Sequence, residues 1–272
     1  MKPYRSGMVW GEGPRWHERA LWLSDTQGSR LWTDQDGSWT ATKLDSPSNG
    51  LWFLPDGRLV AAMMHENRIG VWTGKQFVTH ADLNAVATGP LGDLVGDAQG
   101  NLYVDDVGFA AGEAPRPGRL LRVAINGSVT VAGENLSFPN GLAFIDDGRT
   151  LIIAETAAQR LTAFTVGADG TLTDRRLYAD LADLVGPDAR PDGIWAVPEG
   201  IWVATTTGHA VVLIRDNTVR TKIDTGDEFP IACCSADGNR LFVTLADTGG
   251  RPLFEALAAK AVQTTVVEWE GE

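Results

Sequence analysis

The feature that most constrains this 272-residue chain is a repeated unit of two apolar strands joined by a tight turn. The turns fall at Ala20, Gly57, Gly100, Gly148, Gly200 and Gly238, at intervals of 37, 43, 48, 52 and 38 residues. A period of about 40–50 residues in a chain of short strands is typical of a β-propeller, in which each repeat forms one four-stranded blade. The six turns therefore predict an all-β fold, a six-bladed β-propeller in which residues 1–272 form one domain.

The two ends of the chain are expected to close this propeller. A strand-like run at Thr264–Trp269 follows the last turn, and together with the N-terminal segment it can complete the last blade. Such closure leaves the ring without an open strand edge. The alternative fold is a β-sandwich of hairpins, but sandwiches have turns every ~8–12 residues and no long period. The propeller is therefore the favoured fold.

The composition excludes several classes of protein. Hydrophobic residues make up 43% of the chain and charged residues 21%, which is too apolar for a disordered protein. No apolar run approaches the ~18 residues of a membrane-spanning helix. The net charge of −12, without a cluster of lysine and arginine, argues against nucleic acid or an anionic membrane as a partner. A small-molecule substrate is the expected partner, and the oligomeric state is left open.

The N-terminus and the cysteines indicate a cytoplasmic protein. No apolar segment follows the charged start of the chain, so no secretory signal peptide is expected. Cys233 and Cys234 are adjacent and are the chain's two cysteines. Two ordinary thiols in a strand are favoured over a strained vicinal disulfide, and free thiols fit a reducing cytoplasm.

Counting back eight residues from each turn reaches an equivalent position at the start of each repeat. These positions are Glu12, Asn49, Gly92, Asn140, Asp192 and Pro230. Four of the six carry a carboxylate or an amide, and in a closed propeller they converge at one end of the central channel. Carboxylate and amide oxygens suit calcium, magnesium or manganese, and the lack of histidine and cysteine at these positions argues against zinc.

Asn-Gly and Asp-Gly dipeptides also have a simpler explanation, because Asn140-Gly141 taken alone would indicate only a turn. Their recurrence in one register, joined by Glu12-Gly13, favours a metal site in the central channel. The second strand of each repeat should return to the same face. Polar residues lie at or just past the ends of these strands, among them Asp105, Asp106, Glu155 and Thr206. These residues are candidates for a second polar layer around the metal.

At these residues the chain resembles the regucalcin/gluconolactonase family, which includes luciferin-regenerating-enzyme-like proteins. The most specific matches are Glu12-Gly13-Pro14, Phe138-Pro139-Asn140-Gly141 and Pro191-Asp192-Gly193. The resemblance covers essentially the whole chain. It implies a six-bladed propeller that holds one divalent cation, commonly calcium, and opens lactones by hydrolysis. It also implies that Glu12, Asn140 and Asp192 are the metal ligands and that Asp192 is a general base.

One segment departs from the family pattern. Where family members that act on sugar lactones usually carry an Asn-Asp pair, often preceded by an arginine, this chain reads Pro90-Leu91-Gly92-Asp93. Asp93 is kept and is an alternative general base, but the amide and the cationic group are missing. A polyhydroxylated lactone relies on such groups for orientation. An apolar or aryl lactone is therefore expected to be a better substrate than glucono-lactone.

The distribution of tryptophan supports the same substrate preference. Seven of the ten tryptophans lie within the first 72 residues, and aromatic walls favour flat or apolar substrates. The residues expected to contact the substrate are Asn49, Gly92, Trp16, Trp52, Asp106 and Glu155.

The sequence thus indicates a lactonase-type hydrolase that uses one divalent cation, with calcium as the first choice and magnesium, manganese and zinc as alternatives. Asp192 or Asp93 would take the proton from the attacking water. Two other functions fit the same pattern, because a fold does not determine a function. One is a lyase, isomerase or condensation enzyme of specialised metabolism on the same propeller, and the other is a calcium-binding propeller without catalytic activity.

Overall fold

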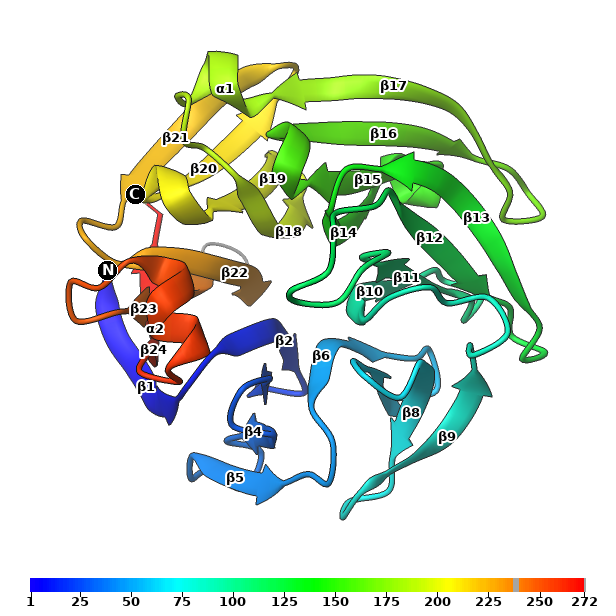
Figure 1. Ribbon diagram of the computed structural model, residues 1–272, viewed down its shortest axis with the longest axis horizontal. Helices are drawn as coiled ribbons and strands as arrows, with labels where there is room; N and C mark the ends of the chain where they lie inside the picture. Colours follow the sequence, from blue (N-terminus) through cyan, green and yellow to red (C-terminus); the bar gives the residue numbers. More distant parts are fainter. Residues whose placement is uncertain (237–239, 272) are drawn as a thin grey trace.

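The computed structural model describes residues 1–236 and 240–271, and these residues form six four-stranded antiparallel sheets. Figure 1 shows the sheets arranged as blades around a central axis, which confirms the six-bladed propeller. The turn at Gly238, expected in the last blade, lies outside the described residues. Within the described residues, no helix is long and apolar enough to span a membrane.

The first three blades follow one another along the chain, each running from the innermost strand outward. Blade 1 consists of β2 (Gly11–His17), β3 (Ala20–Asp25), β4 (Arg30–Thr33) and β5 (Thr40–Lys43). Blade 2 consists of β6 (Ser48–Phe53), β7 (Leu59–Met63), β8 (Arg68–Trp72) and β9 (Phe77–Asp82). Blade 3 consists of β10 (Leu91–Gly96), β11 (Leu102–Asp106), β12 (Gly118–Val123) and β13 (Val129–Leu136).

Blades 4 and 5 follow the same plan, with short helices between some of their strands. Blade 4 consists of β14 (Pro139–Ile145), η1 (Asp146–Gly148), β15 (Thr150–Glu155), η2 (Thr156–Ala158), β16 (Arg160–Val166) and β17 (Leu172–Asp180). The helix α1 (Leu181–Leu184) leads into the next blade. Blade 5 consists of β18 (Pro191–Val197), β19 (Gly200–Thr205), η3 (Thr206–Gly208), β20 (Ala210–Arg215) and β21 (Thr218–Asp224).

Blade 6 is built from both ends of the chain. It consists of β22 (Phe229–Ala236), β23 (Arg240–Asp247), α2 (Leu253–Ala258), β24 (Gln263–Glu270) and the N-terminal β1 (Lys2–Met8). β1 pairs antiparallel with β24, so the first and last strands share one sheet, as the sequence predicts. Cys233 and Cys234 lie in β22 as buried free thiols.

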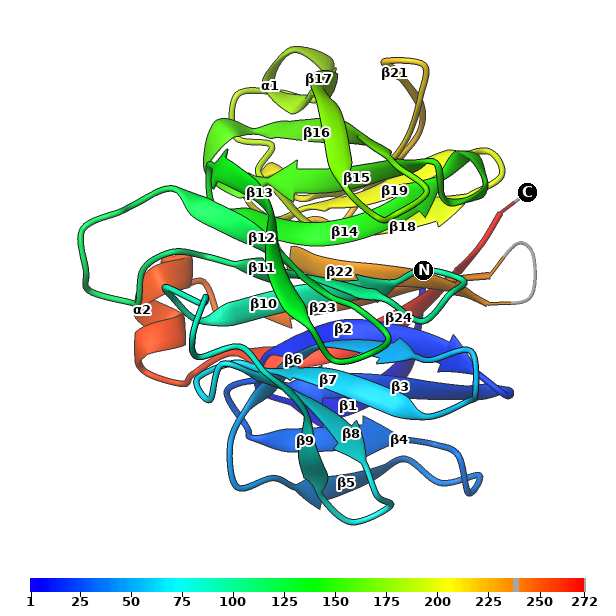
Figure 2. The same cartoon turned by 90° about the vertical axis from the view of Figure 1, so that its right-hand side faces the viewer.

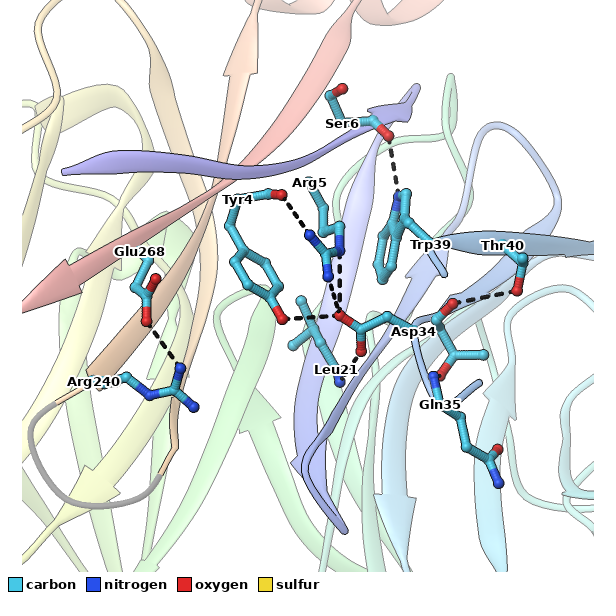
Figure 3. A network of polar contacts seen from close by, with 11 residues as sticks. Tyr4, Arg5, Ser6, Leu21, Asp34, Gln35, Trp39, Thr40, Arg240 and Glu268 are labelled. Carbon is cyan, nitrogen blue, oxygen red and sulfur yellow. Dashed lines mark hydrogen bonds and ion pairs between the residues drawn. The ribbon is translucent and has the colours of Figure 1, made fainter. Parts of the chain in front are cut away.

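Further contacts tie the N-terminal strand to blade 1. Asp34, which follows β4, accepts hydrogen bonds from the Tyr4 hydroxyl at 2.9 Å and from Arg5 Nη2 at 2.7 Å (Figure 3). The same carboxylate accepts a bond from the Leu21 amide at 2.8 Å. Asp34 therefore links the last blade to the first, which strengthens the closure of the ring.

The core lies between the blades, because each blade packs face to face against its neighbours. The second strand of a blade is buried on both faces: every residue of β15 is buried. The outermost strand has no neighbour beyond it, and every residue of β5 is exposed. This burial explains why the second strands read as continuous apolar runs in the sequence.

Adjacent innermost strands lie very close together near the axis. A Cβ atom on Gly141 of β14 would lie 2.4 Å from the carbonyl oxygen of Asp192 in β18. Only glycine allows the two backbones to approach so closely. This packing brings the residues at the starts of neighbouring inner strands within reach of one another.

All innermost strands begin on one face of the propeller, where the second strands end. The helix α2 follows β23 and the 107–117 segment follows β11, so both lie on this face, and Figure 2 shows α2 projecting from one side of the molecule. Any site at the starts of the inner strands lies on the same face as these two segments.

Candidate functional site

The six positions that the sequence aligns are each the second residue of an innermost strand, which confirms the alignment of the repeats. We call them the ring positions: Glu12, Asn49, Gly92, Asn140, Asp192 and Pro230. Asn49 and Asp192 are buried, with 8% and 7% of their surface exposed, whereas Glu12 and Asn140 are partly exposed.

Asn140 and Asp192 form a direct contact across the boundary between blades 4 and 5. Asn140 Nδ2 donates to Asp192 Oδ1 at 2.5 Å, and the Thr206 hydroxyl of η3 donates to Asp192 Oδ2 at 2.9 Å. Asn140 Nδ2 also donates to the Thr156 hydroxyl of η2 at 3.5 Å. Because the amide nitrogen makes these bonds, the Asn140 carbonyl oxygen is the part of the group suited to bind a cation.

Glu12 lies close enough to Asp192 for the two charges to repel each other. Burial raises the pKa of Glu12 well above its usual range, and the negative charge of Asp192 raises it further. The Trp10 indole, which donates to Glu12 Oε1 at 2.8 Å, opposes this rise. Burial likewise raises the pKa of Asp192 to about 7, against the effect of the Thr206 hydrogen bond. Buried carboxylates at these positions favour a cation between them.

Asp93 is held by an arginine that the sequence analysis did not single out. Arg15 Nη2 donates to Asp93 Oδ1 at 3.2 Å and to the Leu94 carbonyl at 3.0 Å. Burial raises the pKa of Asp93, while the Arg15 charge opposes the rise. Only 4% of Arg15 is exposed, so this ion pair is almost completely shielded from water.

Two tryptophans enclose the guanidinium group of Arg15. Its Cζ lies 5.4 Å from the ring centre of Trp52 and 5.3 Å from that of Trp195. The three residues each follow a ring position by three places, after Glu12, Asn49 and Asp192. A comparison of the repeats at this second register would therefore have revealed the Arg15 cluster. Trp52, which was expected to contact substrate, lies three residues beyond the ring position Asn49 along β6, and so deeper than the ring positions.

Trp16 lies near the opposite end of β2 from Glu12. It stacks on Phe242 at 5.2 Å, with Arg240 4.9 Å from its ring centre. Other aromatic side chains lie nearer the starts of the inner strands: Trp10 bonds to Glu12, and Phe229 directly precedes Pro230 and contacts His209 at 4.5 Å. Trp16 thus lies away from the ring positions, whereas Trp10 contacts one of them directly.

Asp106 and Glu155, expected to contact substrate, are fully buried and engaged in bonds that stabilise the blades. Asp106 Oδ2 accepts from the Thr88 amide and hydroxyl at 2.7 and 2.9 Å, and Oδ1 accepts from the Gly108 amide at 2.9 Å. Glu155 accepts from the Ser137 amide at 2.7 Å, and also bonds to a threonine and two arginines, Thr162, Arg160 and Arg175. These contacts occupy both oxygens of each carboxylate.

Glu155→Gln is expected to lower the free energy of unfolding by about 2 kcal/mol at pH 7. Breaking a fully buried ion pair costs ~3–5 kcal/mol. The loss is smaller here because the partners Arg160 and Arg175 are about one-third exposed. Burial by itself would raise the pKa of Glu155. The pKa is nevertheless lowered, by hydrogen bonds from Thr162 and Ser137 and by the charges of the two arginines. A lowered carboxylate pKa stabilises the fold above the unfolded-state pKa and loses this effect as the pH falls through the folded-state pKa.

The difference between wild type and Glu155→Gln should therefore shrink below pH ~4, near the pKa of a free glutamate. Urea unfolding followed by tryptophan fluorescence at several pH values measures it. Glu113→Gln, which breaks an exposed pair with Arg116, is the matched control and should change stability by less than ~1 kcal/mol. An equal loss at pH 3 and pH 7 would contradict the electrostatic explanation.

Within the described ranges 1–236 and 240–271, no three His, Cys, Asp or Glu side chains form a group spaced to hold a metal ion. The predicted ligand set contains two carboxylates and one amide, so it depends on Asn140 as the third ligand. Two surface hollows lie elsewhere: one involves Lys2 and Trp269, and the other Thr88 and Arg119.

The fold and the ring positions together define a six-bladed β-propeller with acidic and amide side chains gathered at one end of its axis. Residues 10–247 match the model of the SMP-30/Gluconolactonase/LRE-like region, and the chain belongs to this family.

Known proteins resemble the chain over most of its length. The pentonolactonase XacC of Haloferax volcanii is 27% identical over 251 residues, which cover 88% of this chain and 82% of that protein. A luciferin-regenerating enzyme superposes with a TM-score of 0.80 at 20% identity, covering 98% of this chain and 92% of the other. A calcium-binding regucalcin of Agrobacterium tumefaciens has a TM-score of 0.77 at 22% identity, with coverage of 97% and 92%.

Proposed function

We propose that the protein is a hydrolase that opens a lactone or a similar cyclic ester, with a divalent cation held by Glu12, Asn140 and Asp192. The main support is that all three residues occupy the second position of an innermost strand, where Asn140 bonds to Asp192 at 2.5 Å and the charge of Asp192 raises the pKa of Glu12. Similarity to a pentonolactonase supports lactone hydrolysis as the reaction. Similarity to a calcium-binding regucalcin supports the cation.

The chemistry of the ring positions fits a hard cation. Carboxylate and amide oxygens are ligands of calcium, magnesium and manganese, and partly exposed Glu12 and Asn140 leave room for water to complete the coordination. Zinc prefers nitrogen and sulfur ligands, and no ring position carries histidine or cysteine. Calcium is therefore our first choice, followed by magnesium and manganese and then by zinc.

A cation held by Glu12, Asn140 and Asp192 would polarise the lactone carbonyl and stabilise the charge that develops on the carbonyl oxygen. Asp192 takes a proton from the attacking water, whose oxygen forms the new bond to the carbonyl carbon. The ester C–O bond then breaks, and the proton passes to the departing ring oxygen, so that one water and one lactone give one hydroxy acid. Asn140 and Thr206 hold the Asp192 carboxylate in place through bonds of 2.5 and 2.9 Å.

Asp93 is the alternative base, but its position suits it better to organise the site. Its Oδ1 accepts from the Leu94 amide at 2.9 Å as well as from Arg15, so this oxygen is already used by two donors. Burial keeps the pKa of Asp93 above its usual range, although the Arg15 charge opposes the rise. Asp93 is therefore the second candidate for the base, after Asp192.

Direct measurement of lactone opening tests the proposal. The protein is stripped of metal with a chelator, supplied in turn with calcium, magnesium, manganese or zinc, and assayed by pH-stat titration of the acid that hydrolysis releases. Hydrolysis that depends on an added cation supports the proposal. If no lactone or ester is opened with any of these cations, the proposal fails, and a different reaction or a binding function takes its place.

We infer a small-molecule partner and a cytoplasmic location. A net charge of −12 argues against nucleic acid and anionic membranes, so the partner is a small-molecule substrate. The buried free thiols Cys233 and Cys234 are compatible with a reducing cytoplasm.

An aryl lactone such as dihydrocoumarin is expected to have a kcat/KM at least about tenfold higher than that of glucono-lactone. Pro90 and Gly92 provide no side-chain donors for sugar hydroxyls, and two missing hydrogen bonds at ~0.5–1.5 kcal/mol each account for this factor. Steady-state kinetics on both lactones in the same calcium buffer measure the ratio.

The variant Phe229→Leu tests the aromatic contribution to this preference, because Phe229 adjoins the ring position Pro230. It should reduce kcat/KM for the aryl lactone and leave that for glucono-lactone nearly unchanged. A wild-type preference for the sugar lactone would show that polar contacts from other residues replace those missing at positions 90 and 92.

A further inference from the structure

A bulge at the start of the innermost strand gives blades 2 to 5 a common local geometry. In blade 4, Pro139 pairs with Glu155 and Leu142 with Ile153. The two residues between, Asn140 and Gly141, therefore face a single residue of the second strand, Ala154. Such an arrangement of two residues against one is a β-bulge. It redirects the ring residue toward the axis.

The same bulge in blades 2 and 5 pairs a polar ring residue with an alanine. In blade 2, Asn49 and Gly50 face Ala62, and in blade 5, Asp192 and Gly193 face Ala204. Ala62, Ala154 and Ala204 are all fully buried. The small residue on the second strand leaves space for the larger side chain at the ring position.

Blade 3 reverses this arrangement. Leu91 pairs with Asp106 and Leu94 with Val104, so the ring residue Gly92 and its neighbour Asp93 face Asp105. Here the ring position has no side chain, and the second strand, which carries alanine in the other three blades, carries a carboxylate. Asp105 is fully buried.

The Asp105 carboxylate occupies the space that a ring side chain would fill. A Cβ atom on Gly92 would lie 2.3 Å from Asp105 Oδ1, so a side chain at position 92 would require the Asp105 carboxylate to move. Asp105 Oδ2 accepts a hydrogen bond from the Asp93 amide at 2.6 Å, which fixes the carboxylate in this orientation.

The other carboxylate oxygen of Asp105, Oδ1, is buried and has no hydrogen-bond partner within the part of the chain that the structure describes. A buried carboxylate oxygen without a partner is costly, and such groups are normally paired or bound to a metal. The charge of Asp105 also acts on Glu12, so the two acids lie within electrostatic reach of each other.

We propose that Asp105 contributes the oxygen group of blade 3 to the cation site by holding a water that binds the cation, in the space left by Gly92. This inference rests on the proposed function, because it assigns a further residue to the same cation. Asp105 would thus act on the cation through water, beside the direct ligands Glu12 and Asp192, and it comes from a second strand and not from an innermost one.

Cation affinity tests this assignment without relying on activity. Terbium luminescence excited through tryptophan suits the site, because Trp10 bonds to Glu12, and calcium titrated against bound terbium gives the calcium affinity. Asp105→Asn keeps the shape of the side chain but removes its charge. It should weaken calcium binding by ~10–100-fold, the usual effect of losing a group that supports a metal site.

Two further variants serve as references for that measurement. Asp34→Asn also neutralises a buried carboxylate, but its partners Tyr4 and Arg5 lie outside the ring positions, so calcium affinity should stay at the wild-type value. Glu12→Gln should weaken binding at least as much as Asp105→Asn. If Asp105→Asn binds calcium like wild type while Glu12→Gln does not, the role of Asp105 is refuted and the proposed cation site stands. If wild type binds no calcium or terbium, both proposals fail.

An exchange of side chains tests the geometry independently. Gly92→Asn alone should lower the melting temperature, because its Cβ would collide with Asp105. The double variant Gly92→Asn/Asp105→Ala reproduces the Asn and Ala pair of blades 2 and 4, so it should melt above the single variant and bind calcium more tightly than Asp105→Ala. If the effects of the two substitutions on the melting temperature and on calcium affinity are simply additive, the proposed exchange of side chains between positions 92 and 105 is refuted.

Discussion

Asp192→Asn is expected to reduce kcat for lactone hydrolysis by ~10²–10⁴, even at saturating calcium. The amide has nearly the same shape as the carboxylate and keeps one oxygen for the cation, but it cannot accept a proton from water. Loss of the negative charge should also weaken calcium binding. Measuring kcat across a calcium titration separates the two effects, because weaker binding is overcome at high calcium and the loss of a base is not.

Thr206→Val is the matched control for this prediction. It removes the 2.9 Å hydrogen bond to Asp192 Oδ2 but leaves the charge and the proton acceptor in place. A hydrogen bond to a charged group contributes about 1.5 kcal/mol, so activity should fall only about tenfold. If Asp192→Asn regains full turnover at saturating calcium, Asp192 serves only to hold the cation. Asp93 then becomes the base to test by substitution with asparagine.

Arg15→Met is expected to lower the free energy of unfolding by about 3 kcal/mol, because it leaves the Asp93 carboxylate buried without its partner. Methionine has a similar length and can still pack between Trp52 and Trp195, so the loss reflects mainly the charge. For a chain of this size, the change corresponds to a decrease of roughly 6–12 °C in Tm. Calorimetry and urea unfolding of the metal-free protein measure it.

A double-mutant cycle identifies the cause of that loss. Arg15→Met/Asp93→Asn contains no uncompensated carboxylate and should be more stable than Arg15→Met alone, with a coupling energy of ~1–3 kcal/mol. Arg240→Met is the control, because Arg240 also lies over aromatic rings and pairs with Glu268 but is about one-third exposed. It should lose less than ~1 kcal/mol. Additive effects of the two changes in the cycle would contradict a direct ion pair.

Several features of the fold could be predicted from the sequence because they repeat. A blade cannot bury its faces alone, so each repeat needs the same alternation of buried strand and tight turn. Counting back from the turns then reached the second residue of every innermost strand, including Glu12, Asn140 and Asp192. The pairing of β1 with β24 also followed from the need to protect an open strand edge.

Other features of the site could not be predicted because they depend on contacts between distant residues. Glu155 is polar and lies at the end of a second strand, yet Arg160 and Arg175 bind it within blade 4. Arg15 resembles a surface charge in the sequence, yet it lies almost completely buried beside Asp93, which is 78 residues away along the chain. A pattern of residue types does not specify which charges will meet.

The sequence by itself determined the number of blades, their register and the residues at the ring positions, because hydrophobic periodicity and turn chemistry are local properties of the chain. The tertiary structure decided which polar groups face one another at the ring. Gly92 reads in the sequence as a missing hydrogen-bonding amide, and only the pairing of β10 with β11 places the Asp105 carboxylate in the space that Gly92 leaves. That exchange depends on the bulge, since two residues of one strand there face a single residue of its neighbour.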